Sequence, residues 1–372
     1  MPYAAPVPLH IDPEANLPIF AQLRQQITWL IASGNLRPGD RLPPIRALAD
    51  QLGIHMHTVR QTYHVLEADG LVETGPGRGT RILPFDLTKL VGQAPDLPSN
   101  TIGVLIPSLN PFYTPFLHGL EATARQSSCL LLVCYTHDSE ELTRHYARQL
   151  IAKNVDGLIA ASPVADVLDG KDPHRAGWPP IVHVDAPQYP DRSILLDLEG
   201  AGFRATTHLA EHGHHRIGLI TAPLKWPNFH ESFEGYQRAL NDSNLGFEPD
   251  LVIETPAFER DCGFQAASRL LELERPPTAI FVSGDLLAVG AIQAIKDSGR
   301  GVPQDIAIAS KDNIDLATLI DPPLTTVSSP TYQMGVEAMN MLNRLRSGQA
   351  VENERVVLDT ELIIRRSCGC SP

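Results

Sequence analysis

The chain has 372 residues, of which 43% are hydrophobic, 20% are charged and five are cysteines. Such a length predicts two or three domains, and the sequence lacks the run of about 18 uncharged apolar residues that a membrane helix needs. Residues 1–10 contain no Lys or Arg, which argues against a secretory signal, and the few cysteines indicate a reducing compartment. We therefore expect a cytoplasmic protein of several domains rather than a secreted, membrane-spanning or disordered one.

The net charge of −13 is unevenly distributed along the chain. Residues 1–84 hold seven Arg, no Lys and seven acidic residues, so this part is neutral. All of the excess negative charge lies after residue 84. Such asymmetry indicates segments with separate roles.

Residues 1–83 are predicted to form three helices followed by a two-stranded ribbon. Apolar residues at helical spacing predict a helix over 18–34, and shorter helices over 44–52 and 57–69 are each followed by a glycine. Short strands over 71–74 and 80–83 flank a glycine-rich tip. This order predicts a winged helix-turn-helix, and the three prolines within residues 84–100 predict a linker after it.

After residue 100, strand-length apolar runs alternate with helical segments. This alternation predicts parallel sheets covered by helices on both faces, and about eight such units are too many for one sheet. We expect an α/β fold in which residues 101–372 form two lobes with a cleft between them. Lobe 1 is expected over about 101–213 and 327–350, and lobe 2 over about 214–326 and 351–372. The expected strands are 102–106, 130–134, 157–161, 181–184, 217–221, 251–254, 279–282 and 306–309, and the expected helices include 112–125, 140–153, 201–212, 233–241, 262–273 and 286–298.

The first segment resembles the DNA-binding domain of the GntR family over about residues 17–83. The resemblance rests on stretches such as Leu36-Arg37-Pro38-Gly39-Asp40, Arg46-Ala47-Leu48-Ala49 and Gly77-Arg78-Gly79-Thr80. It implies that the helix opening at residue 55 enters the major groove of DNA and that the wing glycines let the backbone approach it. The residues expected to contact DNA are Arg46, His55, Met56, His57, Thr58, Arg60, Gly77 and Arg78. Arg24 and Arg41 are expected to be solvated surface residues instead, and His55 and His57 diverge on a helix, which argues against a metal site there.

The second segment resembles the effector-binding domain of the LacI family, itself similar to periplasmic sugar-binding proteins, over about residues 101–368. Matching stretches include Asn110-Pro111-Phe112-Tyr113, Gly213-His214-His215-Arg216-Ile217 and Pro323-Leu324-Thr325-Thr326-Val327. The LacI family's own helix-turn-helix and hinge helix have no counterpart in the sequence, so the chain is similar to hybrid regulators of the arabinose-repressor type. The resemblance implies a ligand-responsive transcription regulator, expected to be a repressor that binds a palindromic operator as a homodimer.

Effector-binding residues are expected where strands of the open sheets end, because ligands bind beyond the carboxyl ends of parallel strands. Alternatives are open for several of them: Asp138 and Asp285 fit helix N-caps, Phe112 fits a core position, and Asp185 could tie loops together. Many sugar-sensing relatives have Arg where this chain has Ser232, and no Lys or Arg stands among the positions chosen. We therefore expect a neutral, hydroxyl-rich effector. The expected set is Asn110, Phe112, Tyr113, His137, Asp138, Ser162, Asp185, Trp226, Asn228, Ser232, Phe258, Asp285 and Asp312.

Two other functional classes compete with a regulator. Some GntR heads precede an aminotransferase-like domain that binds pyridoxal phosphate, but such a domain needs more than the 288 residues after residue 84, and no Gly-x-Ser-x-Gly motif is present. A transport-type sugar-binding protein conflicts with the DNA-binding head. Cys368-Gly369-Cys370 lacks the second pair of ligands that a structural metal site needs, so we expect a reduced, mostly exposed tail and neither metal nor cofactor.

Overall fold

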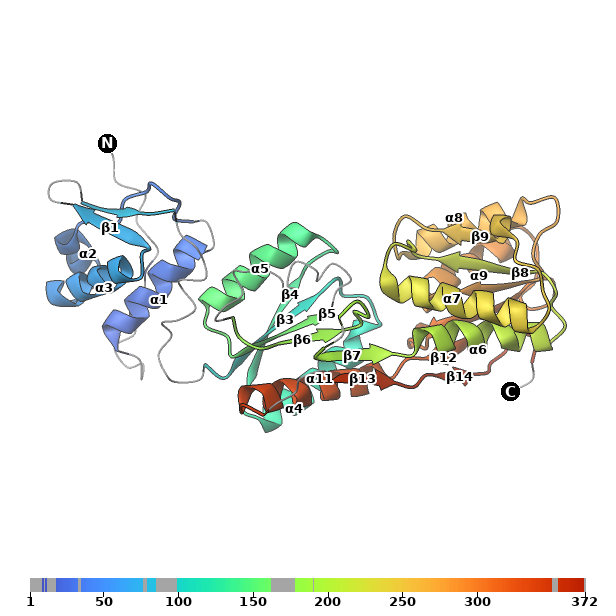
Figure 1. Cartoon of the computed structure of the whole chain (residues 1–372). Helices are drawn as coiled ribbons and strands as arrows, with labels where there is room; N and C mark the ends of the chain where they lie inside the picture. The colour runs from blue at the N-terminus through green and yellow to red at the C-terminus, as the bar shows by residue number, and fades with distance from the viewer. Residues whose placement is uncertain are drawn as a thin grey trace. The chain divides into compact units, whose positions relative to one another are not determined.

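The computed structural model describes residues 9, 11, 18–32, 35–75, 79–84, 99–161, 178–189, 191–349 and 354–370 (Figure 1). The chain divides into two compact units. The first comprises Met1–Pro107, Ser128–Ala160 and Val164–Ile181, and the second comprises Ser108–Ser127, Ala161–Pro163 and Val182–Pro372. Gly77, Arg78, Ser162 and most of the linker expected over 84–100 lie outside the described residues.

The head is a winged helix-turn-helix, as the sequence predicts. Its elements are α1 (Ile19–Ala32), α2 (Ile45–Leu52), α3 (Met56–Ala68), β1 (Val72–Gly75) and β2 (Gly79–Ile82). Strands β1 and β2 pair antiparallel to form the wing. Helix α2 ends because Gly53 takes a left-handed backbone conformation (φ 64°) and its N–H bonds to the carbonyl of Ala49. Buried Leu23, Leu48 and Leu66 join the three helices in one apolar core.

Arg24 is not a free surface residue, contrary to expectation. Its guanidinium lies 3.0–3.1 Å from a carboxylate oxygen of Asp69, whose side chain is 3% exposed. The pair joins α1 to the residue that ends α3. Removal of one partner from a largely buried pair leaves a desolvated charge without compensation.

Arg24→Ala is therefore expected to destabilise the head by about 2–3 kcal/mol, less than for a fully buried pair because Arg24 is partly exposed. Hydrogen exchange of the full chain should show faster exchange of α1 and α3 amides, by about 30- to 150-fold in the limit where exchange reports local opening. Arg125→Ala, at an arginine with a 75% exposed side chain, serves as the control. Unchanged exchange in the Arg24 variant would contradict the role assigned to the pair.

The first six-stranded sheet has the order β13-β7-β6-β5-β3-β4. All of its recorded pairings are parallel. Two helices of the second unit, α4 and α11, pack very closely, because a Cβ atom at Gly119 would lie 2.1 Å from the carbonyl oxygen of Tyr332. The elements are β3 (Thr101–Ile106), α4 (Tyr113–Gln126), β4 (Leu130–Tyr135), α5 (Glu140–Ala152), β5 (Gly157–Ala161), β6 (Ile181–Val184), β7 (Ser193–Leu196), α11 (Thr331–Arg346) and β13 (Arg355–Leu358).

The second six-stranded sheet has the order β14-β12-β11-β10-β8-β9 and is parallel except for the edge strand β14. Its elements are α6 (Leu198–Glu211), β8 (Ile217–Thr221), α7 (Pro227–Asp242), a 3-10 turn (Pro249–Leu251), β9 (Val252–Glu254), α8 (Arg260–Leu271), β10 (Ala279–Val282), α9 (Asp285–Asp297), β11 (Ala307–Asp312), α10 (Leu316–Leu319), β12 (Thr325–Ser328) and β14 (Glu361–Ile363). Among the described helices, none combines the length and apolarity required to cross a bilayer.

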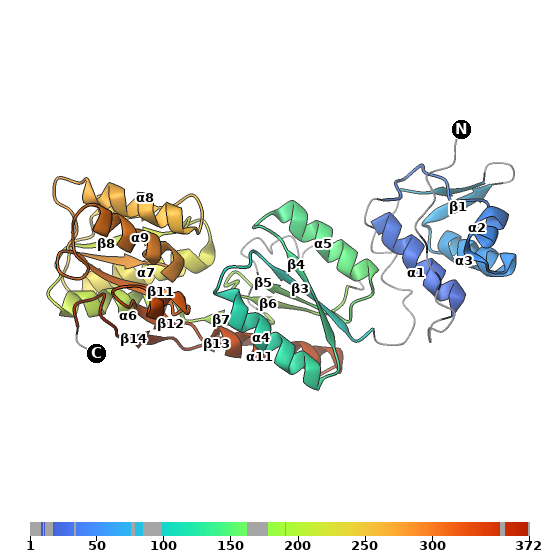
Figure 2. The same cartoon turned by 180° about the vertical axis from the view of Figure 1, so that it is seen from behind.

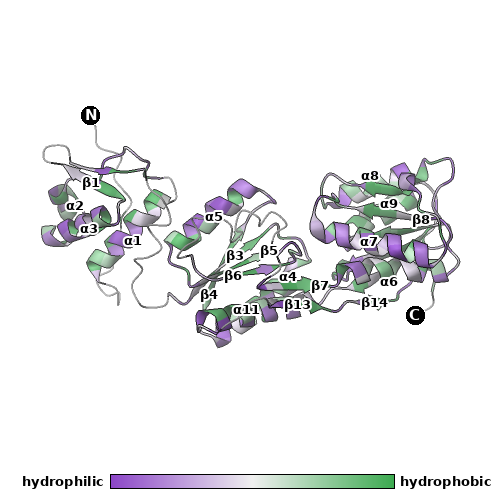
Figure 3. Cartoon of the chain, viewed as in Figure 1, coloured by the Kyte–Doolittle hydropathy of each residue, from purple (hydrophilic) through white to green (hydrophobic). Residues whose placement is uncertain are grey.

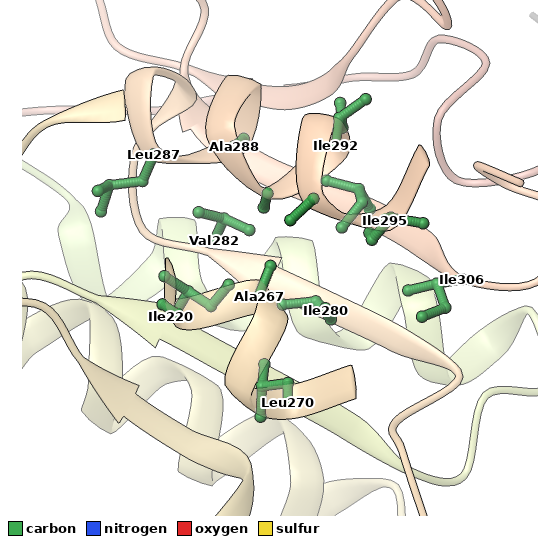
Figure 4. Packing of buried hydrophobic residues seen from close by; sticks show 14 of the residues in the cluster. Ile220, Ala267, Leu270, Ile280, Val282, Leu287, Ala288, Ile292, Ile295 and Ile306 are labelled. Carbon is green, nitrogen blue, oxygen red and sulfur yellow. The ribbon is translucent and has the colours of Figure 1, made fainter. Parts of the chain in front are cut away.

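Helices cover both faces of this second sheet (Figures 1 and 2). Side chains alternate along the strands, so Ile280 and Val282 pack against α8 and α9, whereas Phe281 faces the core formed with α6 and α7. Figure 4 shows the first of these cores, where Leu287 and Ile295 of α9 meet the strand residues. The central strands β8 and β10 are accordingly hydrophobic along their length, as Figure 3 shows. This packing fixes the carboxyl ends of the strands, where the functional side chains emerge.

Strand pairing moves the lobe boundaries expected from the sequence. Helix α6, expected in lobe 1, packs with α7 over the second sheet. Strand β13, expected in lobe 2, pairs with β7 in the first sheet. An apolar period identifies the type of an element but not the sheet that it joins, and four-residue strands such as β7 and β13 are too short to show a period.

Strand β4 differs from the fully covered strand that its apolar sequence suggests. It is the edge of the first sheet, and Leu130, Leu132 and Val133 are 73%, 40% and 36% exposed. Apolar side chains gathered on an edge strand are typical of surfaces that bind another protein.

Candidate DNA interface and effector site

The N-terminal part of α3 has one exposed face. His55, Met56, His57 and Arg60 are exposed, whereas Val59 is fully buried in the core of the head. His55 is the N-cap, and its Nδ1 accepts a hydrogen bond of 3.2 Å from the backbone N–H of His57. The ring of His55 therefore also fixes the start of the helix, which is a role that the sequence analysis did not assign to it.

Two further predicted contact residues of the head lie on α2 and α3. Arg46 of α2 is exposed and Thr58 of α3 is half-buried. In the wing, Gly79 has a φ of 73°, and exposed Arg81 donates a 3.3 Å hydrogen bond to the carbonyl of Gly39. A helix face of this kind, followed by a ribbon with exposed arginine, suits the major groove and the adjacent phosphates.

A cluster of buried polar side chains forms within the second compact unit. Asp185, directly after β6, is 7% exposed and accepts a 3.2 Å hydrogen bond from the side-chain amide of Asn228 at the start of α7. The fold thereby brings together Asp185 and Asn228, two predicted effector-binding residues that are far apart in the sequence. Asp185 has a φ of 52°, which places it in a tight turn after its strand.

Lys311 is part of this cluster, although the sequence analysis placed no cation there. Its ammonium lies 3.5 Å from a carboxylate oxygen of Asp312 and 5.0 Å from the centre of the Phe229 ring. The side chains of Lys311 and Asp312 are 6% and 4% exposed. The cluster therefore contains a buried ion pair whose cation also stacks on an aromatic face.

Three aromatic side chains line up beside the ion pair. The ring of Phe229 lies 5.9 Å from that of Trp226 and 5.7 Å from that of Phe258, measured between ring centres. Phe258 and Asp312 both lie against Gly284, where a Cβ atom would be 2.3 Å from the Phe258 ring and 3.3 Å from Asp312 Oδ2. The glycine therefore allows an aromatic ring and a carboxylate to lie side by side, an arrangement that suits a ligand with an apolar face and hydroxyl groups.

Burial changes the acidity of the carboxyl groups in this region. Desolvation raises the pKa of Asp185 to about 6, although nearby Lys311 and the Asn228 hydrogen bond oppose the shift. Glu231 lies on α7, one turn after Asn228, and its pKa is raised to about 7 by burial and by the charge of Asp185. Burial also raises the pKa of Asp312, against the effect of Lys311. Carboxyl groups with such values can both donate and accept hydrogen bonds near neutral pH.

The side chain of Asp285 lies deeper than expected, and both of its carboxylate oxygens accept hydrogen bonds from residues of its own lobe. One carboxylate oxygen accepts hydrogen bonds from the hydroxyls of Ser310 and Thr326, the latter at 2.7 Å, and the other accepts a 2.8 Å bond from the N–H of Ile314. Asp285 is fully buried. It does not cap α9 either, because Gly284 is the N-cap residue. The carboxylate therefore ties the start of α9 to β11 and β12.

Ser232, and the residues Asn110, Phe112 and Tyr113 that follow β3, make contacts with residues close to them in the sequence. The hydroxyl of Ser232 is fully buried and donates to the carbonyl of Asn228 one turn earlier at 3.4 Å. Asn110 Oδ1 accepts a 3.0 Å bond from the N–H of Phe112, the N-cap residue of α4. Tyr113 is 5% exposed and packs edge-on against Phe112. Only Asn110 and Phe112 of these residues keep a partly exposed surface.

His137 and Asp138 belong to the first compact unit and follow β4. Both have positive φ values, 50° and 54°, and His137 is exposed. Burial raises the pKa of Asp138. The cap of α5 is Ser139, whose hydroxyl accepts a bond from the N–H of Leu142, so Asp138 does not fill the capping role.

The tail is also different from the expected exposed segment. Cys368 is 2% exposed and Cys370 is partly buried.

The residues that sequence reasoning missed at the effector site are Lys311, Phe229 and Glu231. A lysine at the end of the buried strand β11, directly before an aspartate, was the available signal for Lys311.

Comparisons with known proteins agree with this division of the chain. Residues 19–82 match the model of bacterial regulatory proteins of the gntR family, and residues 206–368 match a periplasmic binding protein-like domain. The HTH-type transcriptional repressor CytR of Escherichia coli (strain K12) is 34% identical over 279 residues, which cover 74% of this chain and 81% of CytR.

Solved structures of transcription regulators are also similar to this chain. The transcription regulator CcpA of Lactococcus lactis has a TM-score of 0.65 at 29% identity, covering 72% of this chain and 98% of that structure. A LacI family transcriptional regulator from Enterococcus faecium with bound ribose has a TM-score of 0.62 at 27% identity. The match covers 72% of this chain and 98% of that structure.

The winged head and the two-sheet domain thus define an effector-binding, DNA-binding transcription regulator and not an enzyme. The chain belongs to the family of LacI-type transcriptional repressors. Its DNA-binding head is of the GntR type.

Proposed function

We propose that this protein is a cytoplasmic, homodimeric repressor whose operator affinity is changed by a neutral, hydroxyl-rich small molecule of the sugar class. The observation that carries the choice of effector is the buried group of Asp185, Asn228, Lys311 and Asp312 beside the aromatic rings of Trp226, Phe229 and Phe258. Carboxylates and an amide bind hydroxyl groups, and the rings cover the apolar face of a sugar.

An anionic effector fits this group poorly even though it contains Lys311. The ammonium of Lys311 already faces the Asp312 carboxylate at 3.5 Å, and Asp185 and Glu231 add further acidic groups. A phosphate or carboxylate ligand would meet more negative than positive charge there. Ribose in the Enterococcus faecium regulator supports a sugar as the ligand class.

Within this group, Asp312 rather than Asp285 is proposed as the main acceptor of effector hydroxyls. Asp285 is engaged by three bonds inside its lobe, whereas Asp312, which pairs with Lys311 and accepts a hydrogen bond from the backbone of Asp285, stands at the end of β11 next to Phe258 and Gly284. Asn110, Phe112, Asp138 and Ser162 stay predictions for the same ligand.

Homodimerisation is supported by the apolar edge strand β4, whose Leu130, Leu132 and Val133 are exposed. Burial of these side chains against a second copy removes apolar surface from water. Two heads in one dimer would then bind two half-sites separated by about one helical turn of DNA, about 34–36 Å.

Arg60→Ala tests the DNA-binding role of α3. If the guanidinium of Arg60 contacts a base, operator affinity should fall by about 1–3 kcal/mol, which is about 5- to 150-fold. The measurement is fluorescence anisotropy at one fixed salt concentration, using a duplex selected by the protein from a random library. Arg125→Ala, which removes an exposed arginine outside the head, should leave the affinity unchanged. Equal affinity of the Arg60 variant and the wild type would remove Arg60 from the interface.

A further inference from the structure

Two histidines and a cysteine converge at the end of α6. His208 and His212 lie one turn apart on the same face of the helix. Their Nε2 atoms lie 3.4 Å and 2.9 Å from the sulfur of Cys370, which is 162 and 158 residues away in sequence. Within the part of the chain that the structure describes, these three ligand atoms all lie within 4.8 Å of one another.

The orientation of His212 favours metal ligation. Its Nδ1 lies 2.7 Å from the backbone carbonyl oxygen of His208 and can donate its proton there. This bond selects the tautomer that leaves a lone pair on Nε2, the atom that faces Cys370. Histidines that bind metals commonly hold their second ring nitrogen in this way.

The short segment after β14 brings the cysteine to the helix. Gly369 has a φ of 91°, so the chain can turn sharply between the two cysteines. Cys368 points into the core, where its sulfur lies 3.1 Å from the hydroxyl of Thr325, and Cys370 lies beside α6. His208 is 6% exposed while His212 is exposed, so the site has one buried side and one side open to solvent.

We propose that His208, His212 and Cys370 form a binding site for a tetrahedral divalent metal ion of the zinc class. Zinc–nitrogen distances of about 2.0–2.1 Å and zinc–sulfur distances of about 2.3 Å place ligand atoms that share one ion about 3.3–3.6 Å apart. The nitrogen–sulfur separations of 3.4 Å and 2.9 Å need shifts of up to about 0.7 Å, and the two histidine nitrogens, which lie within 4.8 Å of one another, need to approach by up to about 1.5 Å. Imidazole and thiolate together select zinc over magnesium or calcium.

Three protein ligands leave the fourth position to water. Cys368 also interacts with the side chains of His208 and Cys370, but its sulfur lies 3.1 Å from the hydroxyl of Thr325 in the buried interior and is not one of the three converging ligand atoms. Ion binding requires loss of the Cys370 thiol proton, so affinity should fall as the pH is lowered. The bound ion would link the C-terminal segment to α6, the helix that packs with α7 over the second sheet.

The test uses the untagged full chain, reduced and freed of metal with a chelator, and then titrated with Co²⁺. Binding at this site should give one Co²⁺ per chain, with the thiolate-to-cobalt charge-transfer absorption and the intense visible bands of tetrahedral cobalt. Added Zn²⁺ should displace the cobalt and abolish these bands. Cys370→Ser should eliminate the charge-transfer band, and His212→Ala should weaken affinity at least about ten-fold, as even loss of an outer-shell partner does.

Matched controls separate this site from other histidines and thiols. Cys262→Ser and His214→Ala should bind Co²⁺ as the wild type does, because Cys262 lies on α8 and the His214 ring contacts Thr278. Cys370 and His212 lie near the surface, so their variants should keep the wild-type circular dichroism spectrum. Absence of the charge-transfer band in the wild type would reduce the cluster to a thiol–imidazole hydrogen bond and overturn the proposal. A loss of binding in Cys368→Ser as large as in Cys370→Ser would overturn the three-ligand assignment.

Discussion

Asp285→Ala should lower the unfolding temperature of the effector domain by about 10 °C. The substitution leaves the hydroxyls of Ser310 and Thr326 and the N–H of Ile314 without their acceptor in the buried interior. Unsatisfied buried groups cost about 1–3 kcal/mol each, and partial relaxation brings the sum to about 3–5 kcal/mol. For a domain of this size each kcal/mol shifts the midpoint by about 2–4 °C.

Thermal unfolding of the full chain, followed by circular dichroism, measures this effect. Asp297→Ala, at an exposed residue at the other end of α9, is the control and should change the midpoint by no more than about 1–2 °C. A variant at residue 285 with wild-type stability but without effector binding would show that the carboxylate faces the ligand after all.

Asp312→Asn should weaken effector binding by about 10- to 150-fold while the protein still binds its operator. The amide has nearly the same shape as the carboxylate, but it replaces one acceptor by a donor and removes the charge that pairs with Lys311. Hydrogen bonds to charged groups contribute about 1.5–3 kcal/mol, which corresponds to this range of affinity.

Titration calorimetry with the sugar identified in a thermal-shift screen measures the loss. Asp315→Asn, three residues along the chain at an exposed position, is the matched control and should bind the sugar normally. Wild-type effector affinity in Asp312→Asn would place the ligand elsewhere and leave Lys311–Asp312 as a structural ion pair.

The sequence predicts the head and the strand–helix alternation well because both depend on local signals. Gly53 ends α2 with a left-handed conformation, and β8, β10 and their neighbours are apolar runs between turns. Residue order also places Asp185 directly after a strand and Asp312 near the end of one. These features require no knowledge of which strands pair.

Other features depend on contacts that the sequence does not encode locally. The position of Asp285 at the start of a helix suggested a cap or a ligand contact, but its partners Ser310 and Thr326 come from two neighbouring strands. The Cys370 sulfur contacts His212, which lies 158 residues away in the sequence. The sequence therefore contains no sign that His208 and His212 complete a set of potential metal ligands with Cys370. Lys311 was missed because buried lysines are rare and a strand position gives no hint of a partner.

The central claim is that a sugar-class molecule bound to the α/β domain changes the affinity of the winged head for DNA. The most direct test is the anisotropy of the selected operator duplex with the full chain, measured at fixed salt with and without a saturating concentration of the sugar that stabilises the protein. Our account predicts a change in operator affinity of at least about five-fold, the lower end of typical allosteric coupling, and predicts that Asp312→Asn loses this response at the same sugar concentration. An operator affinity that stays the same when the effector domain is saturated would contradict the account.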